Sequence, residues 1–324
     1  MTAAMLEVDH LSIGFRSGGQ TVLAVDDVSF RVERGGSLGL VGESGCGKTT
    51  IGMALMGLLA PNATVVSGEA RFEGEDLLTA DPERLRQIRW RRISMIFQSA
   101  MNALNPVHRV QDQLAEAIAT HEPELSAHAV AHRTRSLFDL VRIPASRLQD
   151  YPHQFSGGMR QRVIIAMALA CNPSLIIADE PTTALDVIVQ DQILKAIATF
   201  QREMNIGMIF ISHDIAVVAD VSTQIGVMHA GSLVEYGSRQ EVFDCPGHPY
   251  TRLLVSSLLT LSDQPADLSD SACENVTGGP AADRGCPMSD TCPGATAACR
   301  CETGGWVNLS ATHRVRCLNA GRGR

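Results

Sequence analysis

The sequence predicts an α/β fold with a mainly parallel sheet, an antiparallel β part, an inserted helical region and a small cysteine-rich C-terminal extension. Three observations support this prediction. Apolar strand-like segments alternate with helical segments over residues 158–229, which is typical of a parallel sheet. Helical spacing dominates residues 101–157, and six of the nine cysteines lie after residue 272.

The N-terminal part is expected to contain strands that lead into a glycine-rich loop. Alternating apolar and polar residues over 5–13 indicate a half-exposed strand, and residues 22–32 indicate one or two more. Residues 37–41 form a short apolar strand that runs directly into the loop. A helix is expected over residues 49–59 and a hairpin strand over residues 70–77.

The rest of the chain divides into a helical insertion, a second α/β stretch and a tail. A buried strand is expected at 93–97, and three-and-four spacing predicts helices at 110–120 and 125–141. Further helices are expected at 158–170, 188–204 and 215–221, with strands at 175–178, 208–211 and 225–229. Composition then shifts, so we expect one domain over 1–260 and a linker with a cysteine-rich region over 261–324.

Composition excludes several classes of protein. The 324 residues are 45% hydrophobic and 19% charged, which is typical of a globular chain. A net charge of −8 gives no bulk electrostatic basis for a nucleic-acid partner, so none is expected. The longest apolar run, 163–170, is far shorter than the ~20 residues of a membrane span. The first ten residues lack the pattern of a secretory signal.

The glycine-rich loop matches a phosphate-binding pattern. Residues 42–49 fit G-x-x-x-x-G-K-[ST], between an apolar strand and a helix, and this context disfavours a chance glycine turn. Backbone N–H groups of such a loop surround a phosphate chain, Lys48 neutralises it and the Thr49 hydroxyl holds Mg²⁺. The expected nucleotide-binding residues of the loop are Gly42, Ser44, Gly45, Gly47, Lys48, Thr49 and Thr50.

Two carboxylates at the end of a later strand extend this site. Asp179 is placed to reach Mg²⁺, directly or through water, and Glu180 to polarise an attacking water as general base. An apolar run that ends in Asp-Glu is more often an ordinary strand end. The phosphate loop elsewhere in the chain favours the functional interpretation.

A serine and two glycines open the helix expected after the insertion. Ser156, Gly157 and Gly158 supply a hydroxyl, unhindered N–H groups and a positive helix end, which together make a second phosphate site. One chain with two such sites indicates that two chains sandwich each nucleotide.

Together these motifs resemble those of ABC transporter ATP-binding subunits, specifically of the dipeptide/oligopeptide/nickel import subfamily. The resemblance covers nearly the whole chain and rests on residues 42–49, 151–162, 178–187 and 211–214. It implies a P-loop ABC ATPase core and an ATPase that uses ATP and Mg²⁺ and is coupled to transmembrane transport.

The resemblance also implies roles for individual residues. Gln98 would sense the γ-phosphate and Mg²⁺, and His213 would contact the γ-phosphate and the catalytic water. Asp186 would link the two sites of a dimer, in which Ser156, Gly157 and Gly158 cap the partner's nucleotide. Phe15 is the candidate for stacking on adenine, and Val22 lies near the other position considered. The expected catalytic residues are Glu180, His213 and Gln98, and the expected Mg²⁺ ligands are Thr49, Gln98 and Asp179.

The implied partners are two membrane permease subunits, a second homologous ATPase subunit and an extracytoplasmic substrate-binding protein. Residues 99–106 resemble the segment that touches the permease, although a loop into a helix is the plainer interpretation. The implied location is peripheral, at the cytoplasmic face of the bacterial cell membrane. The arginines between 84 and 92 indicate a solvated face, with contact to anionic lipid as the alternative.

Import of peptides is the implied function, with nickel or a metal chelate as the alternative cargo. A non-transport ABC ATPase acting in DNA repair or translation is the alternative function. Such proteins usually carry two ATPase domains, a long coiled coil or inserted zinc modules, none of which this sequence indicates. A small-molecule kinase with the same loop would not explain Ser156-Gly157-Gly158 or Asp186.

Clustered cysteines in a chain without an export signal suggest a metal before disulfides. Four thiolates bind Zn²⁺ or a [4Fe–4S] cluster, and unliganded or oxidised thiols are the third possibility. The tail resembles the C-terminal region of the subfamily, in which such tails are associated with iron–sulfur ligation, and this favours the cluster over Zn²⁺. The expected ligands are Cys286, Cys292, Cys299 and Cys317, with Cys301 as an alternative to Cys299. Cys273, in the linker, is not expected to be a ligand.

Overall fold

The computed structural model describes residues 4–98, 103–183, 185–259 and 285–320. One sheet contains β1 (Leu6–Ser17), β2 (Gln20–Val32), β4 (Ala63–Phe72) and β5 (Glu75–Asp76). The larger sheet contains β3 (Ser37–Val41), β6 (Ile93–Ile96), β7 (Leu175–Asp179), β8 (Gly207–Ser212), β9 (Gln224–His229), β10 (Ser232–Ser238), β11 (Trp306–Asn308) and β12 (Arg314–Arg316).

Nine α-helices lie within the described residues. They are α1 (Lys48–Leu55), α2 (Pro82–Ile88), α3 (Val110–His121), α4 (Ala127–Leu140), α5 (Gly157–Leu169), α6 (Val187–Glu203), α7 (Ile215–Val221), α8 (Arg239–Asp244) and α9 (Pro249–Leu259). Short 3₁₀ turns are η2 (Ala145–Arg147), η3 (Pro152–Gln154) and η4 (Ala297–Arg300). Within the ranges described, no helix is both long and apolar enough to cross a membrane.

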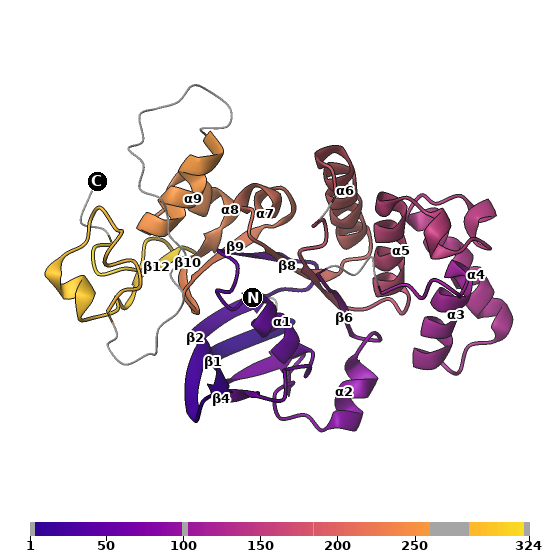
Figure 1. The fold of residues 1–324 in the computed structure, drawn as a ribbon, viewed down its shortest axis with the longest axis horizontal. Helices are drawn as coiled ribbons and strands as arrows, with labels where there is room; N and C mark the ends of the chain where they lie inside the picture. Colours follow the sequence, from indigo (N-terminus) through magenta and orange to yellow (C-terminus); the bar gives the residue numbers. More distant parts are fainter. Residues whose placement is uncertain (1–3, 99–102, 184, 260–284, 321–324) are drawn as a thin grey trace.

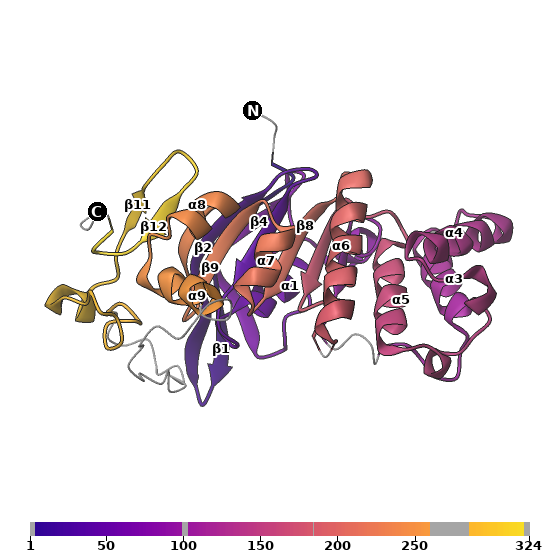
Figure 2. The ribbon, with the colours of Figure 1, turned by 90° about the horizontal axis from the view of Figure 1, so that it is seen from above.

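The two sheets form separate layers. The smaller sheet is antiparallel with the order β2–β1–β4–β5, and the larger has the order β11–β12–β10–β9–β3–β8–β7–β6. In Figure 1 the smaller sheet and α1 lie below the larger sheet, whereas α6, α7 and α9 lie above it. Figure 2, seen from above, shows α3 and α4 at one end of the molecule and the C-terminal strands at the other.

The parallel part of the larger sheet is the predicted α/β core. Strands β9, β3, β8, β7 and β6 are parallel to one another, whereas β10 pairs antiparallel with β9. Every residue of β3, β7 and β8 is buried, which explains their continuous apolar sequences. Their carboxyl ends lie at one edge, which is where open α/β sheets bind ligands. The α/β fold class is therefore confirmed.

Three local features differ from the sequence prediction. Helix α1 ends at Leu55 rather than residue 59, because Gly57 adopts φ +60° and its N–H bonds to the Ala54 carbonyl at 2.9 Å. Strand β4 begins earlier, at Ala63, because it pairs with β1. Helix α2 was not predicted. The sequence feature that marks its start is Asp81, whose side chain accepts the Arg84 N–H. A proline follows at the first helical position.

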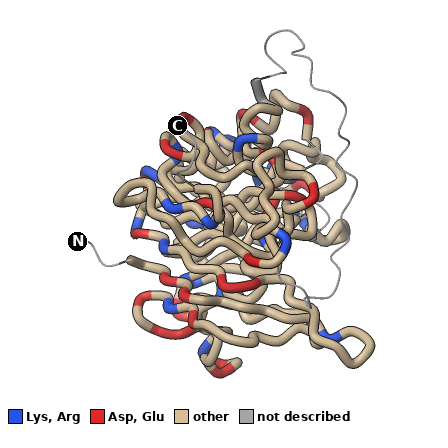
Figure 3. The backbone as a smooth tube through the Cα atoms, turned by 90° about the vertical axis from the view of Figure 1, so that its left-hand side faces the viewer, with Lys and Arg blue, Asp and Glu red and all other residues tan. Residues whose placement is uncertain are grey.

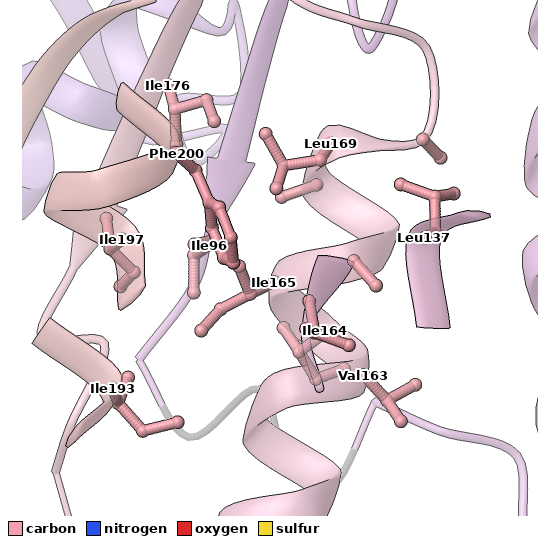
Figure 4. Packing of buried hydrophobic residues seen from close by; sticks show 14 of the residues in the cluster. Ile96, Leu137, Val163, Ile164, Ile165, Leu169, Ile176, Ile193, Ile197 and Phe200 are labelled. Carbon is pink, nitrogen blue, oxygen red and sulfur yellow. The ribbon is translucent and has the colours of Figure 1, made fainter. Parts of the chain in front are cut away.

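Helix α5 joins the inserted helices to the core. Its buried apolar residues belong to one hydrophobic cluster that also contains residues of β6, β7, α4 and α6. In Figure 4 the side chains of Val163, Ile164, Ile165 and Leu169 lie between those of the sheet and α6 on one side and Leu137 of α4 on the other. Burial of this helix on both sides fixes the position of its N-terminus, where Ser156 lies.

The cysteine-rich region continues the larger sheet. Strand β12 pairs antiparallel with β10, with Val315 opposite Glu235, and β11 pairs with β12. Arg314 lies between two aromatic rings, 5.1 Å from the Tyr236 ring centre and 4.6 Å from that of Trp306. Its guanidinium also donates to the Ser29 carbonyl of β2 at 2.6 Å. The C-terminal strands therefore contact both sheets.

Glu241 of α8 binds the C-terminal region and makes stability depend on pH. Burial alone would raise the pKa of its carboxyl group, but hydrogen bonds from Ser310, Ser238 and Thr312 outweigh it and lower the pKa from 4.5 to about 2. A carboxyl with a lowered pKa stabilises the fold above its unfolded pKa and loses that contribution as pH falls through the folded pKa. We therefore expect the free energy of unfolding to fall between pH 4.5 and about pH 2.

Urea unfolding of the full chain at a series of pH values across this window checks the expectation. Glu241→Gln should flatten the pH dependence, because the titrating group is gone. Glu302→Gln is the matched control, since Glu302 is an exposed carboxylate of the C-terminal region. An equal pH slope in the unchanged chain and in Glu241→Gln would rule out this contribution.

The arginines between 84 and 92 are engaged within the chain. Arg84 bonds to Glu75 at 2.7 Å and Arg86 to Glu83 at 2.8 Å. Arg91 pairs with Glu124, Arg92 with Glu73, and Arg89 donates to the Met56 and Gly57 carbonyls. On the side of the molecule seen in Figure 3, basic and acidic residues are interspersed along the backbone. These pairs favour the solvated face over the lipid-binding alternative.

Candidate active site

The glycine-rich loop lies between β3 and α1, as predicted. Gly47 has φ +101°, and a Cβ atom there would lie 2.3 Å from the Ala24 carbonyl oxygen. A Cβ on Gly42 would lie 2.1 Å from the Met228 carbonyl oxygen. Glycine is therefore required at both positions, because β2 and β9 approach the loop too closely for a side chain.

Lys48 is the first residue of α1 and is buried. Its ammonium group donates to the Gly42 carbonyl at 2.7 Å and to the Glu43 carbonyl at 2.8 Å. The positive charge therefore lies inside the loop, next to the N-terminus of the helix. A helix N-terminus and a buried cation both attract phosphate. Ser44, Gly45 and Thr49 are exposed, and Thr50 is half-buried.

Asp179 and Thr49 come together at the edge of the sheet. Asp179 is the last residue of β7, and its Oδ1 lies 3.2 Å from the Thr49 hydroxyl. Burial raises the pKa of Asp179. A carboxylate and a hydroxyl oxygen at this separation match the oxygen ligands that Mg²⁺ prefers.

Glu180 is the centre of a hydrogen-bonded group drawn from three strand ends. Gln98, two residues after β6, donates to its Oε2 at 2.8 Å. His213, directly after β8, places Nδ1 3.0 Å from Oε1. Thr183 donates its hydroxyl to Oε2 at 2.9 Å. Of the three residues predicted as catalytic, His213 and Gln98 thus each contact Glu180 directly.

The surroundings of Glu180 keep it ionised. Burial would raise its pKa, but hydrogen bonds from His213 and Thr183 and the nearby charge of Lys48 outweigh burial and lower the pKa. Its backbone has φ +46°, a conformation unusual outside glycine and common at functional sites. An ionised carboxylate in fixed orientation is suited to accept a proton from water.

Two predicted nucleotide contacts lie at helix starts. Ser156 is exposed, and its hydroxyl accepts the Met159 N–H at 3.3 Å at the start of α5. Asp186 caps α6 by accepting the Val189 N–H at 3.0 Å. Among the described residues, Ser156 forms no hydrogen bond with the glycine-rich loop.

The two positions considered for adenine stacking are neighbours. Phe15 and Val22 face each other as partners across β1 and β2, and Phe15 is half-buried.

Thr183 was not among the residues predicted for the site, although its place three residues after Glu180 in the strand-end motif offered a signal. Residues 99–102 of the expected permease-contact segment lie outside the described residues.

The four predicted cysteine ligands line one pocket. Cys286, Cys292, Cys299 and Cys317 share it with His248, Arg316 and Asn319, and its volume is about 370 Å³ including the part open to solvent. All four are free thiols. Within the described ranges, no three His, Cys, Asp or Glu side chains are grouped closely enough to hold one ion. Cys301 is exposed, and Cys273 lies outside the described residues.

A phosphate loop, a strand-end carboxylate pair, a glutamine and a histidine at neighbouring strand ends, and a Ser-Gly-Gly helix start define an ATP-binding cassette. A solved dimeric ATP-binding cassette, in a post-hydrolysis state with ADP and Pi, matches with a TM-score of 0.65. It covers 72% of this chain and 99% of its own, at 24% identity, and therefore supports the fold.

The chain belongs to the family of ABC transporter ATP-binding proteins. Residues 25–183 match the family described as ABC transporter, and residues 234–299 match the one described as Oligopeptide/dipeptide transporter, C-terminal region. The Dipeptide transport ATP-binding protein DppD of Bacillus subtilis is 43% identical over 97% of this chain and 94% of its own. The Oligopeptide transport ATP-binding protein OppD of Salmonella typhimurium is 43% identical over 91% of this chain and 88% of its own. The predicted family and ATPase class are confirmed.

Proposed function

We propose that this chain binds and hydrolyses ATP to power the import of peptides through a membrane permease. The observation that carries the proposal is the 43% identity to a dipeptide transport ATP-binding protein over 97% of the chain. The match extends past the ATPase core into the oligopeptide/dipeptide transporter C-terminal region. It therefore favours transport over the alternative of a DNA-repair or translation ATPase.

We assign the ATP site as follows. Lys48 and the loop amides bind the phosphates, while Thr49, Asp179 and Gln98 hold Mg²⁺. Glu180 acts as general base towards the attacking water, and His213 contacts the γ-phosphate. The remaining assigned nucleotide contacts are Phe15, Gly42, Ser44, Gly45, Gly47, Thr50 and, in the dimer, Ser156, Gly157, Gly158 and Asp186 of the opposite subunit.

In this proposal ATP closes a dimer of ATPase subunits and hydrolysis reopens it. The second subunit is a homologous chain, and two permease subunits and an extracytoplasmic binding protein complete the transporter. The chain sits peripherally at the cytoplasmic face of the membrane. Residues 1–260 form the nucleotide-binding domain with its helical insertion, and residues 261–324 form the linker and cysteine-rich region. Nickel or a metal chelate is the alternative cargo.

Purification of the tagged chain from its own membranes in mild detergent tests this proposal. We expect two permeases and a second ATPase subunit to be recovered and identified by mass spectrometry. As a control, the chain carrying Glu203→Gln, a change at an exposed site on α6, should recover the same proteins. Recovery only of ribosomal or DNA-repair proteins, without a permease, would overturn the transport role and keep the ATPase chemistry.

We further propose that the cysteine-lined pocket holds a [4Fe–4S] cluster. What supports the proposal is that four free thiols line one pocket, since four thiolates are the usual ligands of such a cluster. Cys286, Cys292, Cys299 and Cys317 would be the ligands. The cluster would supply a structural link between segments that have few large apolar residues.

Iron and sulfide analysis of the anaerobically purified full chain checks this. We expect about four of each per chain and their loss in Cys292→Ser. Cys245→Ser should retain both, because Cys245 is exposed and outside the pocket. Zinc at about one per chain without iron would replace the cluster with the Zn²⁺ alternative. If the purified chain contains neither iron nor zinc, both the cluster and the Zn²⁺ alternative are contradicted.

A further inference from the structure

Tyr250, the second residue of α9, contacts the phosphate-binding loop. The residue is 1% exposed, and its hydroxyl accepts the backbone N–H of Glu43 at 3.1 Å. Its ring packs on His229, the last residue of β9, with ring centres 4.5 Å apart. The preceding residue, Met228, provides the carbonyl that closely approaches Gly42. One side chain therefore contacts the second residue of the loop and also the strand end that supports it.

The segment before Tyr250 lines the cysteine pocket. His248 and Pro249 are among the pocket residues, and the Tyr250 N–H donates to His248 Nδ1 at 3.1 Å. His248 and Tyr250 thus connect the pocket to the loop through two hydrogen bonds.

A shared hydrophobic cluster runs along the same path. Tyr250, Met288 of the cysteine-rich region and Val41, the last residue of β3, belong to one buried cluster. Cys286 and Cys292 pack against it. Val41 directly precedes the loop. Packing and hydrogen bonding therefore join the C-terminal region to the start of the loop.

We infer that Tyr250 is a positioning residue for the phosphate-binding loop, and that through it the C-terminal region sets the affinity for ATP. The inference rests on the proposed function of the loop as an ATP site. Fixing the Glu43 amide fixes the direction in which the chain leaves β3. The following amides then meet the phosphates without further ordering, and this preorganisation strengthens binding.

Tyr250→Phe removes the hydroxyl and keeps the buried ring. We expect the dissociation constant for a non-hydrolysable ATP analogue with Mg²⁺ to rise roughly five-fold, which is about 1 kcal/mol, the usual net value of one hydrogen bond. Hydrogen exchange of the amides at 43–47 should become faster, while the thermal unfolding transition stays close to that of the unchanged chain. Calorimetric titration and exchange mass spectrometry on the full chain measure these quantities.

Tyr236→Phe is the matched control, because the Tyr236 hydroxyl bonds to the Arg31 carbonyl at 3.4 Å, away from the loop. It should leave both the affinity and the exchange of residues 43–47 unchanged. Met288→Ala tests the packing of the cysteine-rich region against Tyr250 and should make hydrogen exchange of the amides at 43–47 faster. Met167→Ala, on α5 in another cluster, is its control.

The outcomes separate the inference from the proposed function. If the unchanged chain does not bind the ATP analogue, the proposed function fails. If it binds and Tyr250→Phe binds equally well with unchanged loop exchange, Tyr250 is not a positioning residue. If Tyr250→Phe has the expected effect but Met288→Ala leaves loop exchange unchanged, the connection to the C-terminal region is overturned.

Discussion

Replacing Glu180 with glutamine should reduce ATP hydrolysis by about 10³-fold, within the range that general-base catalysis contributes. The amide keeps the size and one acceptor oxygen, so contacts to Gln98 and Thr183 are retained in part. It cannot accept a proton from the attacking water. Lys48, Thr49 and Asp179 are untouched, so ATP binding should remain and bound ATP should be trapped. Glu180→Gln therefore separates binding from turnover.

Phosphate release and retention of labelled ATP by the full chain measure the two effects. Glu203→Gln makes the same chemical change at an exposed position of α6 and should hydrolyse ATP normally. Hydrolysis at the unchanged rate in Glu180→Gln would remove Glu180 as the general base. Loss of ATP binding in that variant would instead assign Glu180 to nucleotide binding.

Replacing Glu235 with alanine should destabilise the junction between the core and the C-terminal region by about 3–5 kcal/mol. Glu235 is fully buried in β10. Its carboxyl accepts the N–H groups of Gly247 and His248, both at 2.8 Å, and lies 2.7 Å from Nε2 of the buried His313. Alanine would leave these groups without their acceptor inside the protein, and unpaired buried polar groups are costly.

Urea unfolding and limited proteolysis of the full chain test this expectation. Glu235→Ala should expose residues 285–320 to protease, because His313, next to β12, loses its side-chain contact with β10. Glu235→Gln keeps an acceptor oxygen and the volume, so its loss of stability should be smaller. Equal stability and equal protease resistance in the unchanged chain and in Glu235→Ala would show that this contact does not hold the C-terminal region.

The core elements could be predicted because their sequence patterns are local. Strand β3 spans the predicted residues, and α7 begins and ends where predicted. The site could be predicted for a related reason. Glu180 and His213 follow apolar strands, and parallel strands place their carboxyl ends at one edge. Once the topology is known, contact between these residues follows.

The C-terminal contacts could not be predicted because they depend on distant partners. Strands β11 and β12 have three residues each, too short for an alternating pattern. Strand β12 forms by pairing with β10, and β11 by pairing with β12. Glu235 and His313 are 78 residues apart, and Glu43 and Tyr250 are 207 apart. No local pattern indicates that a carboxyl within a strand or a tyrosine near a helix start has such a partner.

Uptake of labelled dipeptides and oligopeptides by cells that lack this chain tests the central claim most directly. The account predicts that deletion abolishes uptake of one of these peptide classes. The unchanged chain should restore uptake, and a chain carrying Glu180→Gln should not. Uptake of both peptide classes at the normal rate in the deleted cells, with nickel uptake lost instead, would contradict peptide import and assign the alternative cargo. Normal uptake of peptides and nickel alike would contradict the importer role itself.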